Sequence, residues 1–254
     1  MLALAPTTLP DSEPVEYVRA ALAARYDAIG LRLNRSPGLP FHPIVGNAPL
    51  IRELKAMLEI SVLDIYSFYL RPETDLGQYL PALELGAELG ARYAVVMGDD
   101  PDWVRQRDNF ARICDAAAGC GLTCVAEFAV IRPLASLGQT VRLIAEAGRK
   151  NAAVCLDPLN FVRGGGKASD LKALDPALFP YLQLTDGFLD PGTGPNRRCL
   201  MGEGAVPMRE ILAALPKGLA LSVEFPITIQ NRLGPMQWAK HVADTSRQFL
   251  AGIQ

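Results

Sequence analysis

The chain alternates short apolar runs with longer amphipathic stretches, eight times from one end to the other. The apolar runs predict strands at residues 2–5, 28–33, 61–69, 93–98, 122–128, 152–157, 180–186 and 219–225. The stretches between them predict helices at residues 13–26, 47–58, 76–89, 102–118, 137–147, 168–174, 207–214 and 235–251. Strict alternation of this kind is typical of a parallel sheet with crossover helices.

Eight strand–helix units fill all 254 residues, and one (β/α)₈ domain usually has ~250. The sequence therefore predicts an α/β fold, a single-domain TIM barrel over residues 1–254. A doubly wound open sheet is the alternative, but it needs a glycine-rich first turn, which the opening MLALAPTT lacks. The glycine-rich segment GGGKAS at residues 164–169 does not have the phosphate-loop spacing, so we interpret it as a loop after the sixth strand.

The composition is that of an ordinary globular protein, with 50% hydrophobic and 20% charged residues. Because 25 basic residues face 27 acidic ones, no basic excess favours nucleic acid or an anionic membrane. Five dispersed cysteines without a CxxC pair argue against disulfides, and no signal peptide or membrane span is evident. We expect a cytoplasmic protein whose partner is a small-molecule substrate; a homo-oligomer is compatible with this composition.

Polar side chains interrupt the apolar runs near the ends of four successive predicted strands. They are Glu127, Asp157, Gln183 and Glu224. An isolated acid at such a point is more often a helix cap, but four equivalent positions would converge at the mouth of a barrel, where active sites lie. Three carboxylates there would repel one another unless a cation neutralised them. Because all four donors are oxygens, we predict one divalent metal ion, Mn²⁺ or Mg²⁺.

The order and spacing of these residues resemble those of the xylose isomerase-like barrel superfamily, the sugar phosphate isomerase/epimerase group. VAEF contains Glu127, CLDP contains Asp157, LQLTDG contains Gln183, and SVEFP contains Glu224. The GEG at residues 202–204 is similar to the family's loop between the last two strands. The resemblance covers essentially the whole chain, and it implies that these four residues are the metal ligands.

The chain departs from the family pattern at two positions. Gln183 stands where the family usually has a histidine, as it does in members similar to bacterial 3-dehydroshikimate dehydratase. Asn160 stands where the family often has another histidine. Apurinic endonucleases of the endonuclease IV type share the fold but need several histidines, whereas this chain has only His42 and His241, which argues against a nuclease.

The resemblance implies an isomerase or epimerase of a small, ketose-like polyhydroxylated carbonyl compound, acting through a metal-stabilised enediolate. Glu127 and Glu224 would be the catalytic acid and base, while Asp157 and Gln183 would serve mainly as ligands. Two alternatives stay open. One is a metal-dependent lyase of the 3-dehydroshikimate or inosose dehydratase kind, and the other is a non-catalytic binding subunit.

Four arginines follow predicted strands or precede the GEG segment, which places them on the rim of the mouth. They are Arg32, Arg71, Arg163 and Arg198. Because the guanidinium group binds carboxylates and phosphates through a planar fork of donors, we predict that they bind substrate. The alternative for any one of them is an ion pair with a nearby acid such as Asp99.

Overall fold

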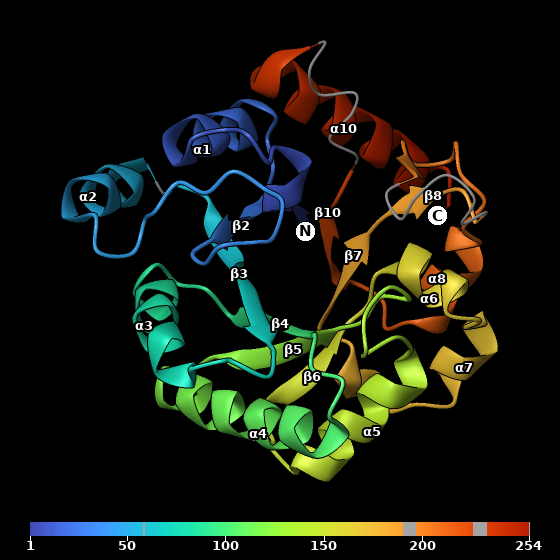
Figure 1. Ribbon diagram of the computed structural model, residues 1–254. Coiled ribbons are helices and arrows are strands. Elements are labelled where there is room, and N and C mark those ends of the chain that lie inside the picture. The colour runs from blue at the N-terminus through green and yellow to red at the C-terminus, as the bar shows by residue number, and fades with distance from the viewer. Residues whose placement is uncertain (58, 190–196, 226–232, 254) are drawn as a thin grey trace.

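The computed structural model describes residues 1–57, 59–189, 197–225 and 233–253, and it confirms the predicted barrel (Figure 1). Eight strands lie side by side in the order β6-β5-β4-β3-β2-β1-β10-β7, every pair parallel. Their bounds are β1 Leu2–Leu4, β2 Ala28–Arg32, β3 Ser61–Leu70, β4 Tyr93–Gly98, β5 Thr123–Glu127, β6 Ala152–Cys155, β7 Tyr181–Leu184 and β10 Ala220–Val223. A parallel bridge between Leu156 and Leu182 closes the ring between β6 and β7.

Helices surround the barrel, as Figure 1 shows from one end. They are α1 Pro14–Ala23, α2 Ala48–Met57, α3 Leu80–Glu88, α4 Trp103–Gly119, α5 Leu137–Ala147, α6 Pro158–Arg163, α7 Ala168–Lys172, α8 Met208–Ala214 and α10 Gly234–Ala251, with short 3-10 turns η1 Pro6–Thr8, η2 Leu76–Tyr79 and η3 Pro176–Leu178. The ends of α5 follow local chemistry: the Ser136 side chain accepts from the Gln139 N–H, and Gly148 ends the helix with φ 64°. Within the described part of the chain, no helix is both long and apolar enough to cross a membrane.

Two elements near the mouth were not predicted from the sequence. Helix α6 has six residues, too few to produce a helical periodicity, and its capping residue is Asp157, whose Oδ1 accepts from the Asn160 N–H. The second element is a small antiparallel ladder between β8 (Asp186–Gly187) and β9 (Arg198–Cys199). Each strand of this ladder has two residues, so only the pairing between distant segments defines it.

The barrel interior is apolar at one end and becomes polar toward the mouth. Small and aliphatic side chains, among them Ala3, Ala28 and Val125, pack inside the ring with the buried rings of Tyr66 and Tyr181. The fully buried carboxyl group of Asp64 lies among them, next to Gly30 in β2. A Cβ on residue 30 would be 2.3 Å from Asp64 Oδ1, so glycine is required at this close approach.

Burial raises the pKa of Asp64 from 3.8 to about 7. The folded protein therefore holds this proton more tightly than the unfolded chain, and stability is lost as pH rises from about 4 through 7. We expect Asp64→Asn to reduce the fall in unfolding free energy between pH 5 and pH 8 by about 1–3 kcal/mol, measured by urea unfolding in EDTA. Asp108→Asn, on the exposed face of α4, is the control; an undiminished fall in Asp64→Asn would contradict the assignment.

Candidate active site at the mouth of the barrel

Four buried polar side chains lie at the C-terminal ends of neighbouring strands, as predicted. Glu127 is the last residue of β5, Asp157 follows β6, Gln183 lies in β7, and Glu224 follows β10 directly. Their residues are 7%, 1%, 0% and 6% exposed, respectively. Since parallel strands end at the same rim, the four side chains belong to one buried cluster at the mouth.

Hydrogen bonds and ion pairs join three of the four into one network. The Gln183 Nε2 donates to Glu224 Oε2 at 2.8 Å, and also to the Tyr66 hydroxyl at 2.9 Å. The guanidinium group of Arg198 forms ion pairs with both Glu224 and Asp157, the latter at 2.6 Å. The network therefore runs from Asp157 through Arg198 and Glu224 to Gln183.

Glu127 lies beside this network, close enough for its charge to interact with the other acids. Burial, followed by the charges of Glu224 and Asp157, raises its pKa from 4.5 to about 8. Its Oε2 is buried without a hydrogen-bond partner among the described residues, and so is the Oε1 of Gln183. An unpartnered buried acceptor costs about 1–3 kcal/mol, so both oxygens are suited to meet a cation or a hydrogen-bond donor from water or a ligand.

The donor chemistry of this cluster suits a hard divalent cation: every donor is oxygen, and two of the oxygens lack partners. The arrangement sets one condition. Across the described ranges, no three His, Cys, Asp or Glu side chains converge as a metal cage, and Arg198 lies between Asp157 and Glu224. Binding a cation here therefore requires the Arg198 guanidinium to withdraw from at least one of these carboxylates.

A carboxylate anchor holds Arg198 over the mouth. Asp186 in β8 accepts four backbone N–H groups, from Gly187 (2.8 Å), Gly202 (2.9 Å), Gly204 (3.1 Å) and Val206 (3.3 Å). A Cβ on Gly204 would be 2.0 Å from Asp186 Oδ1, which explains the second glycine of GEG. Because β8 pairs with β9, the anchor also fixes the strand that carries Arg198.

We expect Asp186→Asn to lower the free energy of unfolding by about 2–4 kcal/mol, because an amide cannot accept all four N–H groups and hydrogen bonds to a charged acceptor are the stronger kind. Urea unfolding measures this loss. The control is Asp175→Asn, which changes a carboxylate that accepts the Ala177 N–H at the start of η3. Equal, small losses in both variants would contradict the role of Asp186.

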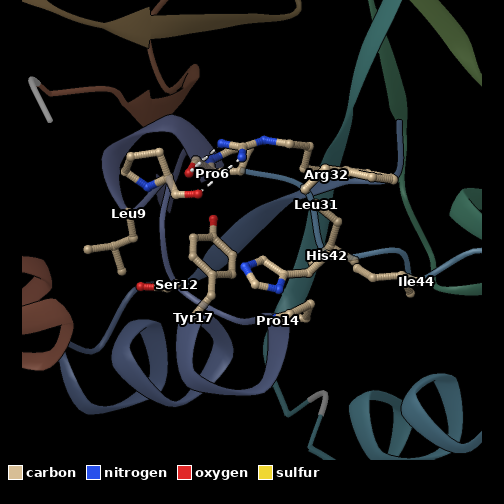
Figure 2. A pocket seen from close by; sticks show the side chains of 11 residues that line it. Pro6, Leu9, Ser12, Pro14, Tyr17, Leu31, Arg32, His42 and Ile44 are labelled. Carbon is tan, nitrogen blue, oxygen red and sulfur yellow. Dashed lines mark hydrogen bonds between the residues drawn. The ribbon is translucent and has the colours of Figure 1, made fainter. Parts of the chain in front are cut away.

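Arg32 forms hydrogen bonds with the loops beside the mouth (Figure 2). Its two Nη atoms donate to the backbone carbonyls of Pro6, Pro10 and Pro40, at 3.0–3.2 Å. These bonds join the segment after β1 to the loop after β2. A pocket lies between these segments, and both Arg32 and His42 line it. Both terminal nitrogens of Arg32 thus already donate to backbone carbonyls of these loops, and substrate binding by Arg32 stays a prediction.

A second group of arginines surrounds Tyr69 at the end of β3. Arg71 and Arg132 both pair with Asp99, and both lie over the Tyr69 ring, at 4.7 and 5.3 Å from its centroid. The charge of Arg132 also lowers the pKa of Glu127 against the effect of burial. The substrate role of Arg71 stays a prediction.

Arg163 and Arg198 contact different parts of the rim. Arg163 donates through Nη2 to the Phe188 carbonyl at 2.7 Å, and substrate binding by it also stays a prediction. Arg198 is the predicted arginine that directly contacts the predicted carboxylates. Two further residues contact the cluster. The sequence left Tyr66 undecided between core and pocket wall, and it did not predict Thr185, whose Oγ1 donates to Asp157 Oδ1 at 2.7 Å.

Comparison with known proteins agrees with this architecture. Residues 18–249 match the family model described as "Xylose isomerase-like TIM barrel". Among solved structures, the chain is similar to the IolI protein with a bound zinc atom (TM-score 0.84, 16% identity, covering 100% of this chain and 99% of that one).

Two further solved structures are similar over nearly their whole length. A probable 3-DHS dehydratase, AsbF, from Bacillus anthracis has a TM-score of 0.74 and 13% identity, with 97% of this chain and 98% of that one covered. A D-allulose 3-epimerase from Methylomonas sp. has a TM-score of 0.73 and 16% identity, with 100% and 96% covered. At these identities the likeness establishes the fold. No curated protein sequence matches the chain.

Proposed function

Because the chain belongs to the xylose isomerase-like TIM barrel family, we propose that it is a divalent-metal-dependent isomerase or epimerase of a small, ketose-like compound. One observation carries the proposal. Glu127, Asp157, Gln183 and Glu224 form a buried oxygen-donor cluster at the barrel mouth, in which Glu127 Oε2 and Gln183 Oε1 have no hydrogen-bond partner among the residues that the structure describes. The solved structures that resemble this chain include an epimerase and a zinc-bound protein, which supports the same class.

Glu127 and Glu224 have different surroundings, and this difference suggests a separate catalytic role for each. Glu224 is held by Arg198 and by the Gln183 amide, whereas Glu127 Oε2 has no hydrogen-bond partner in the described part of the chain, which suits it to exchange a proton with substrate. Strands β6 and β7 separate β5 from β10, so the two carboxyl groups reach the mouth from different directions. This arrangement supports the proposal that Glu127 and Glu224 remove a proton next to a carbonyl on one side and return it on the other.

The other members of the cluster would bind and orient. A divalent cation held by Glu127, Asp157, Gln183 and Glu224 would polarise the substrate carbonyl as a Lewis acid. Arg198, once displaced from a carboxylate, has donors for the substrate's oxygen atoms. Arg32, Arg71 and Arg163 extend the set of cations around the rim.

A carbon–oxygen lyase is the second candidate, and Gln183 is the residue that favours it, since dehydratase-like members of the superfamily share this glutamine. The early chemistry is the same, because a base removes a proton next to a carbonyl. The later step differs, because a lyase expels the neighbouring hydroxyl as water and leaves a conjugated product.

The decisive experiment incubates the protein with Mn²⁺ in D₂O and a panel of ketoses, inososes and hydroxylated keto acids. We expect deuterium to enter the carbon next to the carbonyl, and EDTA to abolish this exchange. A product that absorbs in the ultraviolet would assign the lyase instead. Exchange that EDTA leaves unchanged would contradict metal dependence, and no turnover of any panel member by Mn²⁺-loaded protein would contradict the substrate class.

A further inference from the structure

The amide of Gln183 has one orientation in the structure, and its neighbours explain why. Both of its donor positions are used, because Nε2 donates to the Tyr66 hydroxyl at 2.9 Å and to Glu224 Oε2 at 2.8 Å. The remaining group, Oε1, is buried and has no hydrogen-bond partner within the described ranges of the chain. An amide has one acceptor oxygen, so using both N–H groups on the protein side leaves that oxygen for the ligand.

Glu224 and Tyr66 together hold this orientation against its reverse. The Glu224 carboxylate is an acceptor only, so it takes one N–H of the amide and disfavours the amide oxygen, while the Tyr66 hydroxyl accepts the second N–H. In the Gln183 bond the Tyr66 hydroxyl is the acceptor, so its own proton must be directed elsewhere.

The carboxyl of Asp64 lies near Tyr66 and is able to accept this proton. The hydroxyls of Tyr66 and Tyr181 lie close enough to Asp64 to lower its pKa against the effect of burial, although neither forms a hydrogen bond of full geometry with it. Asp64 Oδ1 and the Tyr66 ring also flank Gly30, at 2.3 and 3.2 Å from the position of a Cβ there. With its proton drawn toward Asp64, the Tyr66 oxygen is left to accept from Gln183.

We propose that Tyr66 is a positioning residue, which holds the Gln183 amide with its oxygen toward the mouth of the barrel. The identity of the group that this oxygen meets, a divalent cation, rests on the proposed function. A reversed amide would present its NH₂ group to that cation and its oxygen to the carboxylate of Glu224, and both contacts are repulsive. A single-oxygen ligand such as glutamine therefore needs partners that fix its orientation, and Tyr66 is the partner that acts together with Glu224.

The barrel interior offers a matched control for the test. Tyr181 is as deeply buried as Tyr66 and also lies near Asp64, but its hydroxyl contacts the Cys155 sulfur. Tyr66→Phe and Tyr181→Phe thus remove the same atom from buried sites near Asp64, and only the first of these hydroxyls accepts from Gln183. We expect Tyr66→Phe to weaken Mn²⁺ binding about 10- to 100-fold by titration calorimetry, the usual effect of losing a group that orients a ligand, and Tyr181→Phe to weaken it less than about 3-fold.

A double-mutant cycle separates positioning from a general structural effect. In a Gln183→Ala background, Tyr66→Phe should weaken Mn²⁺ binding by less than about 2-fold, because the amide on which it acts is gone. A full, additive loss in that background would overturn the proposal. Equal losses in Tyr66→Phe and Tyr181→Phe would overturn it as well.

A second readout needs no metal and separates this inference from the proposed function. In ¹⁵N-labelled, metal-free protein, we expect the Gln183 NH₂ protons to exchange slowly with solvent in the native chain and in Tyr181→Phe, and at least about 10-fold faster in Tyr66→Phe. If the native protein bound no Mn²⁺, the proposed function would fail while this comparison still decided the role of Tyr66. Equal exchange in all three proteins would overturn that role.

Discussion

Replacing Glu127 with Gln is expected to lower kcat/KM for the substrate by at least about 1000-fold, while making the metal-free protein more stable. The loss of activity follows from the role of the carboxyl group, because an amide cannot take up the proton next to a carbonyl. The gain in stability follows from the raised pKa of about 8, since burial beside Glu224 and Asp157 disfavours the charged form in the folded state. Stability is thus lost as pH rises from about 4.5 through 8, and Glu127→Gln should recover about 1–3 kcal/mol of it at pH 8.

The measurements are deuterium exchange into substrate and urea unfolding in EDTA at pH 5 and pH 8. Glu210→Gln, an exposed substitution on α8, is the control and should change neither quantity. An active Glu127→Gln enzyme would remove Glu127 from the chemistry. If the variant were inactive but no more stable than the native protein at pH 8, the folded state would not disfavour the charged form of Glu127.

Replacing Arg198 with Ala is expected to lower the unfolding free energy of the metal-free protein by about 3–5 kcal/mol, and to tighten Mn²⁺ binding. The first effect arises because Asp157 and Glu224 lose the cation that neutralises them in the buried network. The second arises because the guanidinium and a metal ion compete for the same two carboxylates. We expect Mn²⁺ affinity to rise at least about 10-fold, so that added metal restores most of the lost stability.

Arg197→Ala is the matched control, because the neighbouring Arg197 lies over the Phe188 ring at 4.8 Å from its centroid. Thermal melting with a Mn²⁺ titration measures both effects in both variants. Weaker Mn²⁺ binding in Arg198→Ala would show that Arg198 supports the cation rather than competing with it. That result would contradict the inference that Arg198 must withdraw from Asp157 or Glu224 before a cation can bind.

The sequence predicted the barrel and the positions of the four cluster residues, because both can be recognised from patterns within short stretches of the chain. Strands buried on both faces are continuous apolar runs, so polar residues such as Glu127, Gln183 and Glu224 stand out where the runs end. Helix α5 was predicted to the residue, since a capping serine and a terminal glycine mark its ends. These signals need no knowledge of distant parts of the chain.

The remaining parts of the site depend on contacts between distant segments. Arg198 reaches the carboxylates because β9 pairs with β8. Each of these strands has only two residues, which is too short to give a recognisable strand pattern in the sequence. Tyr66 lies in an aromatic strand whose register shifts between Ile65 and Phe68, so simple alternation does not reveal which ring faces the barrel interior. The partners of Arg32 were open for the same reason, since the backbone carbonyls that bind it come from other segments, whereas Asp99, the partner of Arg71, was the alternative that the sequence offered.

An anomalous difference map from Mn²⁺-soaked crystals, recorded at the manganese edge, tests the central claim most directly. The account predicts one strong peak at the barrel mouth, within ligand distance of Glu127, Asp157, Gln183 Oε1 and Glu224, with the Arg198 guanidinium moved off at least one carboxylate. A map without a peak there, in which Arg198 still bridges Asp157 and Glu224 at saturating Mn²⁺, would contradict it.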